Sequence, residues 1–127
     1  MARRKDDADH ECPVEITLDV IGGKWKGMVL YQLLEGTARF NEIRRALPKA
    51  TQRMLTLQLR ELESDGVIQR KVYAEVPSKV EYSLTEFGLS LKPILLQMQD
   101  WGTQYRVKLK QSRKTALAKD ISPALRS

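Results

Sequence analysis

The segment from Arg39 to Lys71 constrains the fold most, because two helical patterns in it are separated by a proline. In the first pattern Phe40, Ile43 and Leu47 recur at the spacing of one helix face. Pro48 ends this helix, since its ring disfavours the α conformation of the preceding residue and it has no N–H to donate. The segment therefore begins with a short helix and a tight turn.

A second, longer helix is predicted to follow that turn. Thr51 is suited to cap it, because a threonine hydroxyl can accept a hydrogen bond from an otherwise unpaired backbone N–H. Leu55, Leu59 and Leu62 share one face of this helix. Asp65-Gly66 ends it, because glycine tolerates the left-handed cap, and a strand begins at Val67. Two helices joined by a short turn predict a helix-turn-helix.

The face of the second helix opposite the leucines has a composition that admits two interpretations. At about 100° per residue, Arg53, Leu57 and Arg60 point outward, and Gln52 and Thr56 flank them. Such residues can form an ordinary solvated face, or they can reach base edges in a major groove. The residues on either side of the segment favour the second interpretation.

Two strands are expected directly after the second helix. Residues 67–74 and 80–84 are enriched in Val, Ile and Tyr, and a turn segment lies between them. A hairpin in this place, with Lys79 at its tip, predicts the wing of a winged helix; a plain hairpin that covers the core is the alternative.

Helices are also expected at both ends of the domain. Residues 13–21 begin with Pro13, which suits a first helical turn, and have apolar residues on two faces. Residues 24–34 form a central core helix. Residues 85–110 form a last helix, with a kink at Pro93.

The first and last helices are predicted to form a homodimer. A small domain can cover only one of two apolar helix faces with its own core, and a second copy covers the other. The residues assigned to this contact are Ile16, Val20, Leu89, Leu96 and Val107.

The net charge of +6 lies entirely in residues 106–127, which hold seven Lys or Arg and one Asp. The rest of the chain has 15 residues of each sign. Residues 39–79 are nonetheless locally basic, with nine Lys or Arg and five acids, which suits phosphate binding. Residues 1–11 are expected to form a flexible arm, residues 12–110 one folded domain, and residues 111–127 a disordered basic tail.

Composition argues against several other classes. One cysteine excludes an internal disulfide framework, and the absence of a secretory signal or a long apolar run points to a cytoplasmic protein without a membrane span. With one His and one Cys, the chain has no evident catalytic constellation, metal cluster or phosphate loop. We therefore expect a protein that is not an enzyme and needs no cofactor or metal.

Several motifs resemble one family. The runs CPVEITLDVIGGKWKGMVLYQLLEGTARFNEIRRALP, MLTLQLRELESDGVIQR, VPSKVEYSLTEFG and DWG occur over residues 12–102 in the order found in the HxlR-type (DUF24) winged-helix regulators, which are related to the MarR type. The resemblance implies a prokaryotic transcription regulator that binds pseudo-palindromic duplex DNA as a homodimer. It implies a mainly α fold with a small β-hairpin, a recognition helix at 51–64 and a wing at 72–82. Ser78 and Ala50-Thr51 depart from the usual family residues.

The expected DNA contacts divide into two kinds. Base edges would be read by Gln52, Arg53 and Thr56, and Leu57 either meets a thymine methyl group or packs in the core. Phosphate would be bound by basic side chains that set the register. The full predicted DNA-binding set is Arg44, Arg45, Lys49, Thr51, Gln52, Arg53, Thr56, Arg60 and Lys79.

Cys12 is a candidate sensor of oxidants or electrophiles. It precedes Pro13 at a helix N-terminus, where the backbone dipole favours a thiolate, and it matches the position of a sensing cysteine in the family. Glu11 and Glu15 oppose the thiolate, and a buried apolar role is the alternative. Two further alternatives stay open, namely a regulator controlled by a small aromatic ligand and a module that binds protein or RNA instead of DNA.

Overall fold

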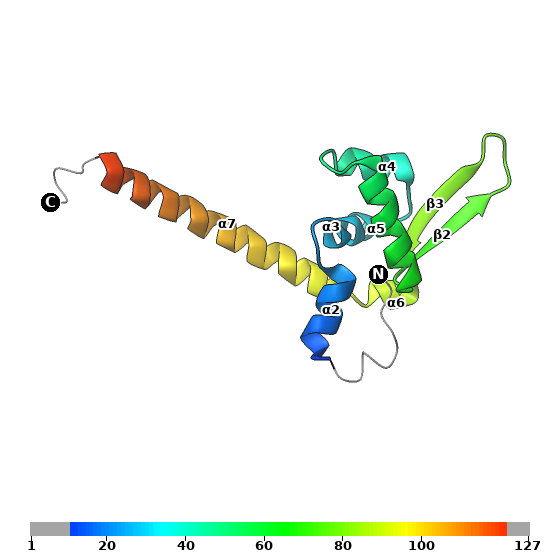
Figure 1. Ribbon diagram of the computed structural model, residues 1–127, viewed down its shortest axis with the longest axis horizontal. Helices are drawn as coiled ribbons and strands as arrows, with labels where there is room; N and C mark the ends of the chain where they lie inside the picture. The colour runs from blue at the N-terminus through cyan, green and yellow to red at the C-terminus, as the bar shows by residue number, and fades with distance from the viewer. Residues whose placement is uncertain (1–10, 122–127) are drawn as a thin grey trace. The chain divides into compact units, whose positions relative to one another are not determined.

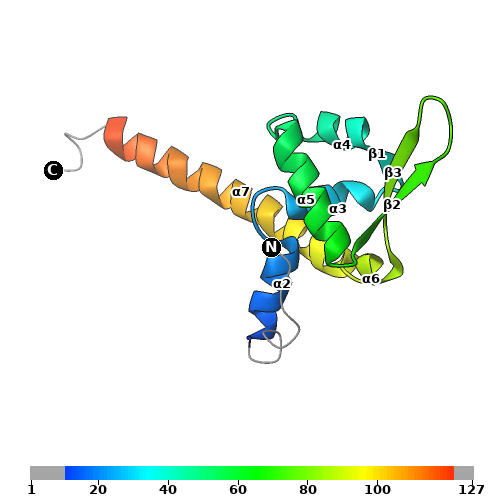
Figure 2. The same cartoon turned by 45° about the vertical axis from the view of Figure 1, so that its right-hand side comes forward.

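The computed structural model describes residues 11–121, so most of the arm predicted for 1–11 and the last six residues of the predicted tail lie outside the described part. The chain divides into two compact units, Met1–Lys92 and Pro93–Ser127. The first unit contains the helix-turn-helix and the sheet, and the described part of the second is one long helix. Figures 1 and 2 show the helices and the hairpin of the first unit from two directions.

The first unit begins with α2 (Pro13–Ile21) and α3 (Lys26–Leu33), in agreement with the two helices predicted there. Cys12 is the N-cap residue of α2, and its carbonyl accepts a hydrogen bond from the Ile16 N–H at 3.1 Å. In α3 the side chains of Val29, Leu30 and Leu33 are buried, so α3 is the central core helix.

The helix-turn-helix consists of α4 (Phe40–Ala46) and α5 (Gln52–Ser64), and it confirms the main prediction. The Met54 N–H donates to the Thr51 hydroxyl at 3.1 Å, which is the expected cap. Leu55, Leu59 and Leu62 are fully buried, as their spacing predicted. Gly66 has a φ of +79°, the left-handed conformation that ends the helix.

The strands β2 (Ile68–Tyr73) and β3 (Lys79–Leu84) pair antiparallel in a register that runs from Ile68↔Leu84 to Tyr73↔Lys79. They form the predicted hairpin, which projects from the helices in Figure 1. A two-residue strand, β1 (Ala38–Arg39), pairs with the other edge of β3, giving the order β1-β3-β2. This third strand was not predicted.

The core lies between α3, α4, α5 and the sheet. Its fully buried side chains are apolar and come from all of these elements; the largest are Leu30, Ile43, Leu47, Leu55, Leu59, Leu62 and Ile68. Burial of each such side chain contributes roughly 1.5–3 kcal/mol, so this core fixes how α5 is presented.

The last predicted helix is two helices, α6 (Glu86–Leu89) and α7 (Lys92–Ile121). The helix was predicted to bend at Pro93, but the break lies before that residue, and Pro93 occupies the first turn of α7, where a missing N–H is harmless. Gly88 is buried, and a side chain there would collide with the Val67 carbonyl. Tight packing against the start of the sheet thus fixes α6.

The prediction of a disordered segment from residue 111 was wrong for residues 111–121, which continue α7. That stretch lacks an apolar period, but it consists largely of good helix formers and contains neither Gly nor Pro. No helix in the described part of the chain is both long enough and apolar enough to span a bilayer.

Candidate nucleic-acid interface

The outward face of α5 lies opposite its buried leucines. Gln52, Arg53, Thr56, Leu57 and Arg60 line one shallow depression on the surface, so the structure brings together the residues predicted to read DNA. Leu57 is 52% exposed, which excludes a role in the domain core and leaves its methyl groups free for contact. The face thus combines two guanidinium groups, an amide, a hydroxyl and an apolar side chain.

The hydroxyl of Thr56 has a defined direction. It donates to the Gln52 carbonyl at 2.8 Å, so its oxygen remains available as an acceptor. Thr51 has a different role from its neighbours, because its hydroxyl already accepts the Met54 N–H. The predicted site residue Thr51 is therefore first of all the residue that starts the helix.

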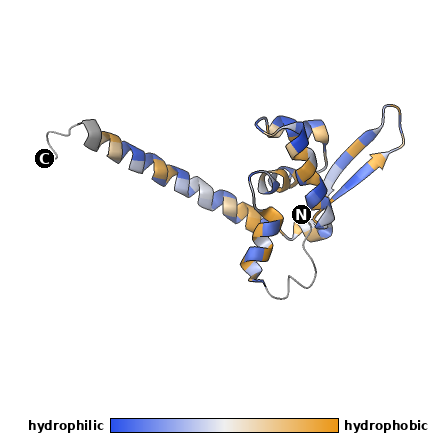
Figure 3. Ribbon diagram, viewed as in Figure 1, coloured by the Kyte–Doolittle hydropathy of each residue, from blue (hydrophilic) through white to orange (hydrophobic). Residues whose placement is uncertain are grey.

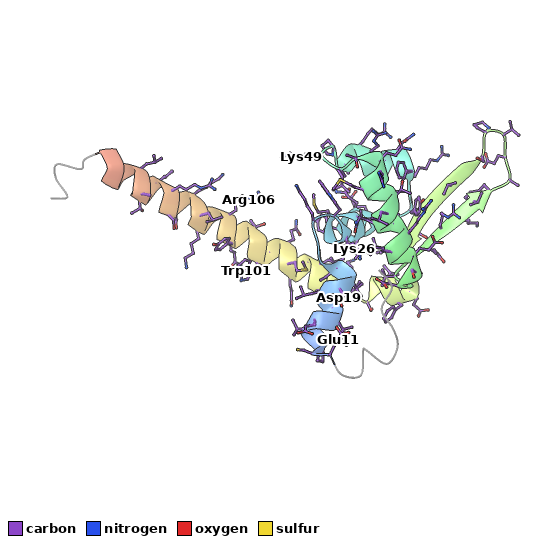
Figure 4. The ribbon with its side chains drawn as sticks, viewed as in Figure 1. Glu11, Asp19, Lys26, Lys49, Trp101 and Arg106 are labelled. Atoms are coloured by element: carbon purple, nitrogen blue, oxygen red, sulfur yellow. The ribbon has the colours of Figure 1, made fainter. Side chains whose placement is uncertain are left out.

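A second depression lies on α4 and the turn after it. It is lined by Asn41, Arg44, Arg45, Pro48 and Ala50. Arg44 and Arg45 are exposed in the last turn of α4, where cations are favourable beside the helix C-terminus. Lys49 is exposed in the turn between α4 and α5 (Figure 4). These three cations and the α5 face border the same turn.

The charged residues in the central part of the helix-turn-helix, residues 43–60, are all basic. Residues 43–60 contain five Lys or Arg and no acid. The acids at either end are engaged elsewhere: Glu42 accepts from the Arg39 N–H at 3.0 Å, and Glu61 binds Lys26 at 2.8 Å. An anionic polymer would therefore meet a run of cations with no acid between Ile43 and Arg60.

In the wing, Lys79 is more constrained than the sequence suggested. Its ammonium lies 3.2 Å from the Glu81 carboxylate and 4.9 Å from the centre of the Tyr73 ring. The hydrogen bond from Lys79 lowers the pKa of Glu81, so this acid stays ionised beside the cation. Part of the charge predicted for the wing is thus balanced within the hairpin.

Sequence reasoning missed Lys71, whose ammonium lies over the same Tyr73 ring as that of Lys79. Its ammonium is 4.9 Å from the centre of the Tyr73 ring, and its side chain is exposed. Strand alternation from Tyr73 would have placed Lys71 on the same face of β2, so the signal was present. Lys71 and Lys79 together make the hairpin cationic on that face.

The residues assigned to dimer contacts differ in exposure. Ile16 and Val20 are half-buried, whereas Leu89, Leu96 and Val107 are exposed. The exposed apolar side chains of α2 are instead Val14 and Leu18, at 64% and 55%. Cys12 is exposed at the start of the same helix. Among the described residues, no group of His, Cys, Asp or Glu is arranged to bind a metal ion.

Comparison with known proteins agrees with this geometry. The model of the HxlR-like helix-turn-helix family matches residues 20–110. The chain is 62% identical over 109 residues to the uncharacterized HTH-type transcriptional regulator YdeP of Bacillus subtilis. The matched segment covers 86% of this chain and 85% of YdeP.

Solved structures of regulators are also similar. The redox regulator HypR in its reduced form is 63% identical with a TM-score of 0.75, covering 79% of this chain and 99% of HypR. The quinone-bound YodB from B. subtilis is 34% identical with a TM-score of 0.62, covering 73% of this chain and 99% of YodB. The winged helix-turn-helix, its basic outward face and these similarities agree, and the chain belongs to the HxlR-like helix-turn-helix family of transcriptional regulators.

Proposed function

We propose that this regulator binds a pseudo-palindromic duplex as a homodimer and that Cys12 makes the binding sensitive to oxidants or electrophiles. The observation that supports DNA binding most directly is the outward face of α5, where Arg53, Leu57 and Arg60 are exposed with cations of α4 next to them. Such a protein acts where the DNA is, in the cytoplasm.

Base recognition is assigned to α5. Arg53 suits the two acceptors of a guanine, and Gln52 suits an adenine. Leu57 lies between the two arginines in the same depression, so its methyl groups can contact a thymine methyl. Because Leu57 is exposed and buries no apolar surface in the domain, a contact with a thymine methyl group gives a reason for its place.

Phosphate binding is assigned to Arg44, Arg45, Lys49 and Arg60, which border the recognition face, and to Lys79 with Lys71 in the wing. These side chains set affinity and register but read no sequence. Lys79 is expected to contribute less than a free lysine, because Glu81 lies 3.2 Å from it.

The predicted dimer residues Leu89, Leu96 and Val107 are exposed, but they lie away from the longest apolar stripe of α7. We therefore assign dimer formation to that stripe and to the exposed apolar side chains of α2, in place of the predicted residues. In α7, Ile94, Met98, Trp101, Tyr105 and Leu109 recur at intervals of three or four residues, which makes one apolar stripe. The Trp101 and Tyr105 rings stack at 5.1 Å, and Trp101 is 67% exposed. A second copy is the natural cover for such a surface, as it is for Val14 and Leu18 on α2.

The sensing role is assigned to Cys12, which is exposed at the N-cap of α2 next to Val14. It is supported by the similarity to HypR, solved in oxidized and reduced forms, and to YodB, solved with quinone. Two thiols can be oxidised to an intersubunit disulfide while an azo reagent such as diamide takes up the two electrons and two protons. Alternatively, the thiolate adds to a quinone ring carbon. The proton on that carbon then moves to one quinone oxygen, and the other oxygen takes a proton from water, equivalent to the one that the thiol lost, so that a hydroquinone thioether forms.

Selection of duplexes from a random pool by the purified full-length protein tests the DNA-binding proposal. We expect enrichment of a site with two inverted halves whose centres lie about 34 Å apart, one helical turn. Enrichment of a single half-site would contradict the dimer, and enrichment of no sequence would contradict sequence-specific binding.

A further inference from the structure

The C-terminal half of α7 is rich in basic residues and is not part of the recognition face assigned to α5. The family model ends at residue 110, whereas α7 continues to Ile121. Residues 101–119 contain six Lys or Arg and no acid. Because this stretch is helical, the basic residues between Arg106 and Lys114 occupy fixed positions around the helix axis, which a disordered tail would not give them.

Four of these cations lie on one side of the helix. Arg106, Lys110, Arg113 and Lys114 are spaced at i, i+4, i+7 and i+8, so at about 100° per residue they fall within one quadrant or slightly more. All four side chains are exposed. Lys108 points to the opposite side.

This basic stripe (Arg106, Lys110, Arg113 and Lys114) has no evident role in the stability of α7. None of its members has a carboxylate three or four residues away, so helix salt bridges are not formed. The favourable field of a helix C-terminus acts only within about the last turn, and Lys114 lies well before Ile121. Four like charges on one side instead repel one another, which favours an anionic partner.

The stripe is also separate from the apolar stripe proposed to form the dimer. Arg106 directly follows Tyr105 and Lys110 directly follows Leu109, so each cation is turned by about 100° from the apolar residue before it. Figure 4 shows Trp101 and Arg106 pointing to opposite sides of α7. A second copy that covers the apolar stripe therefore leaves the basic stripe open.

We propose that the basic stripe binds the phosphate backbone of duplex DNA, which rests on the DNA-binding function proposed above. The four residues span about 12 Å of helix axis at 1.5 Å per residue. Phosphates follow one another at about 3.4 Å per strand along the duplex axis, so the stripe can meet several of them. Its contacts add affinity and salt dependence but no sequence preference.

The test measures binding of the full-length protein to a selected duplex and to a scrambled duplex at several salt concentrations. The variant combines Arg106→Gln, Lys110→Gln, Arg113→Gln and Lys114→Gln, because glutamine removes the charge and keeps helix propensity. We expect the plot of the dimer's log affinity against log salt to become less steep by up to about 7, because the two chains together lose eight charges at about 0.9 each, with the same loss on both duplexes.

A matched pair of single variants controls for nonspecific charge loss. Lys110→Gln removes a charge from the basic stripe, and Lys108→Gln removes one from the other side of the same helix, two residues away. The first should reduce the slope by about 2 for the dimer, which loses two charges, and the second should leave it unchanged. Because Lys108 lies on the side of the apolar stripe, sedimentation first shows that Lys108→Gln is still a dimer. This pair remains informative if the fourfold variant does not fold, which circular dichroism will show.

The outcomes separate the two proposals. If the wild-type protein binds the selected duplex and the fourfold variant binds with the same slope, the basic stripe does not contact DNA, although the regulator does. If Lys108→Gln and Lys110→Gln reduce the slope equally, the effect is one of net charge and the stripe has no specific role. If the wild-type protein binds no duplex, the DNA-binding function itself fails.

Discussion

The Nζ atom of Lys26 lies 2.8 Å from a carboxylate oxygen of Glu61, which joins the central helix α3 to the recognition helix α5. Both side chains are largely covered, at 12% and 23% exposure, so the pair is better shielded from water than a surface salt bridge. Glu61 directly follows the outward-facing Arg60 and lies on the side of α5 that faces α3. The contact therefore helps to fix the angle at which α5 is presented.

The Lys26–Glu61 pair predicts a pH dependence of stability. The hydrogen bond from Lys26 lowers the pKa of Glu61 below its ordinary value of 4.5. Because the folded pKa is the lower one, the contribution is complete above pH 4.5 and is lost as the pH falls through the folded pKa. We expect Glu61→Gln to cost roughly 1 kcal/mol at pH 7 and nothing in strong acid, measured by urea unfolding. An equal cost at all pH values would contradict this account.

The N-cap of the recognition helix predicts a second stability effect. Thr51→Ala removes the acceptor for the Met54 N–H and should cost about 1 kcal/mol in free energy of unfolding. Thr51→Ser keeps the hydroxyl and is the control. If both variants lose the same amount, the hydrogen bond is not the cause.

Substitution of Arg53 is expected to reduce the sequence specificity of DNA binding. Arg53→Ala should weaken binding to the selected duplex by roughly 1–3 kcal/mol and binding to a scrambled duplex by much less. Arg44→Ala, which removes a proposed phosphate contact from α4, should weaken both equally. Competition titrations with the two duplexes measure the difference, and an equal loss for Arg53→Ala would reassign this residue to phosphate.

The response to oxidants or electrophiles proposed for Cys12 should be lost on substitution without loss of DNA binding. Cys12→Ser should bind the selected duplex as the wild-type protein does, because Cys12 lies outside the helix-turn-helix. Diamide or a quinone should change binding of the wild-type protein and leave that of the variant unchanged. A response that persists in Cys12→Ser would exclude the thiol as the sensor.

The apolar stripe of α7 predicts the oligomeric state. Trp101→Glu places a charge in the proposed dimer contact and should raise the dimer dissociation constant at least tenfold, because an unpaired buried charge costs several kcal/mol. Gln111→Glu introduces the same charge away from the stripe and should leave the dimer intact. Sedimentation equilibrium distinguishes these results, and a dimeric Trp101→Glu would place the interface elsewhere.

Local patterns predicted the helix-turn-helix well. The spacing of Leu55, Leu59 and Leu62, the cap at Thr51 and the glycine at 66 are short-range signals, and all were confirmed. These signals suffice because each depends only on neighbouring residues and on which face meets the core.

Features that depend on distant residues were not predictable in the same way. β1 exists only because Ala38 and Arg39 pair with Tyr82 and Glu81, far along the chain. The end of α7 was missed because a helix exposed on every side has no apolar period to reveal it (Figure 3). In α2 the two apolar faces were recognised, but only the packed structure shows that Val14 and Leu18 are the exposed ones.

The most direct test of the central claim is a titration of the selected and scrambled duplexes with the wild-type protein between 50 and 200 mM salt, with stoichiometry measured by sedimentation. We expect two chains per duplex, an affinity for the selected duplex that exceeds the scrambled one by at least roughly 10³-fold, and a steep salt dependence on both. Equal affinity for the two duplexes, or one chain per duplex at saturation, would contradict a dimeric regulator that reads sequence through α5.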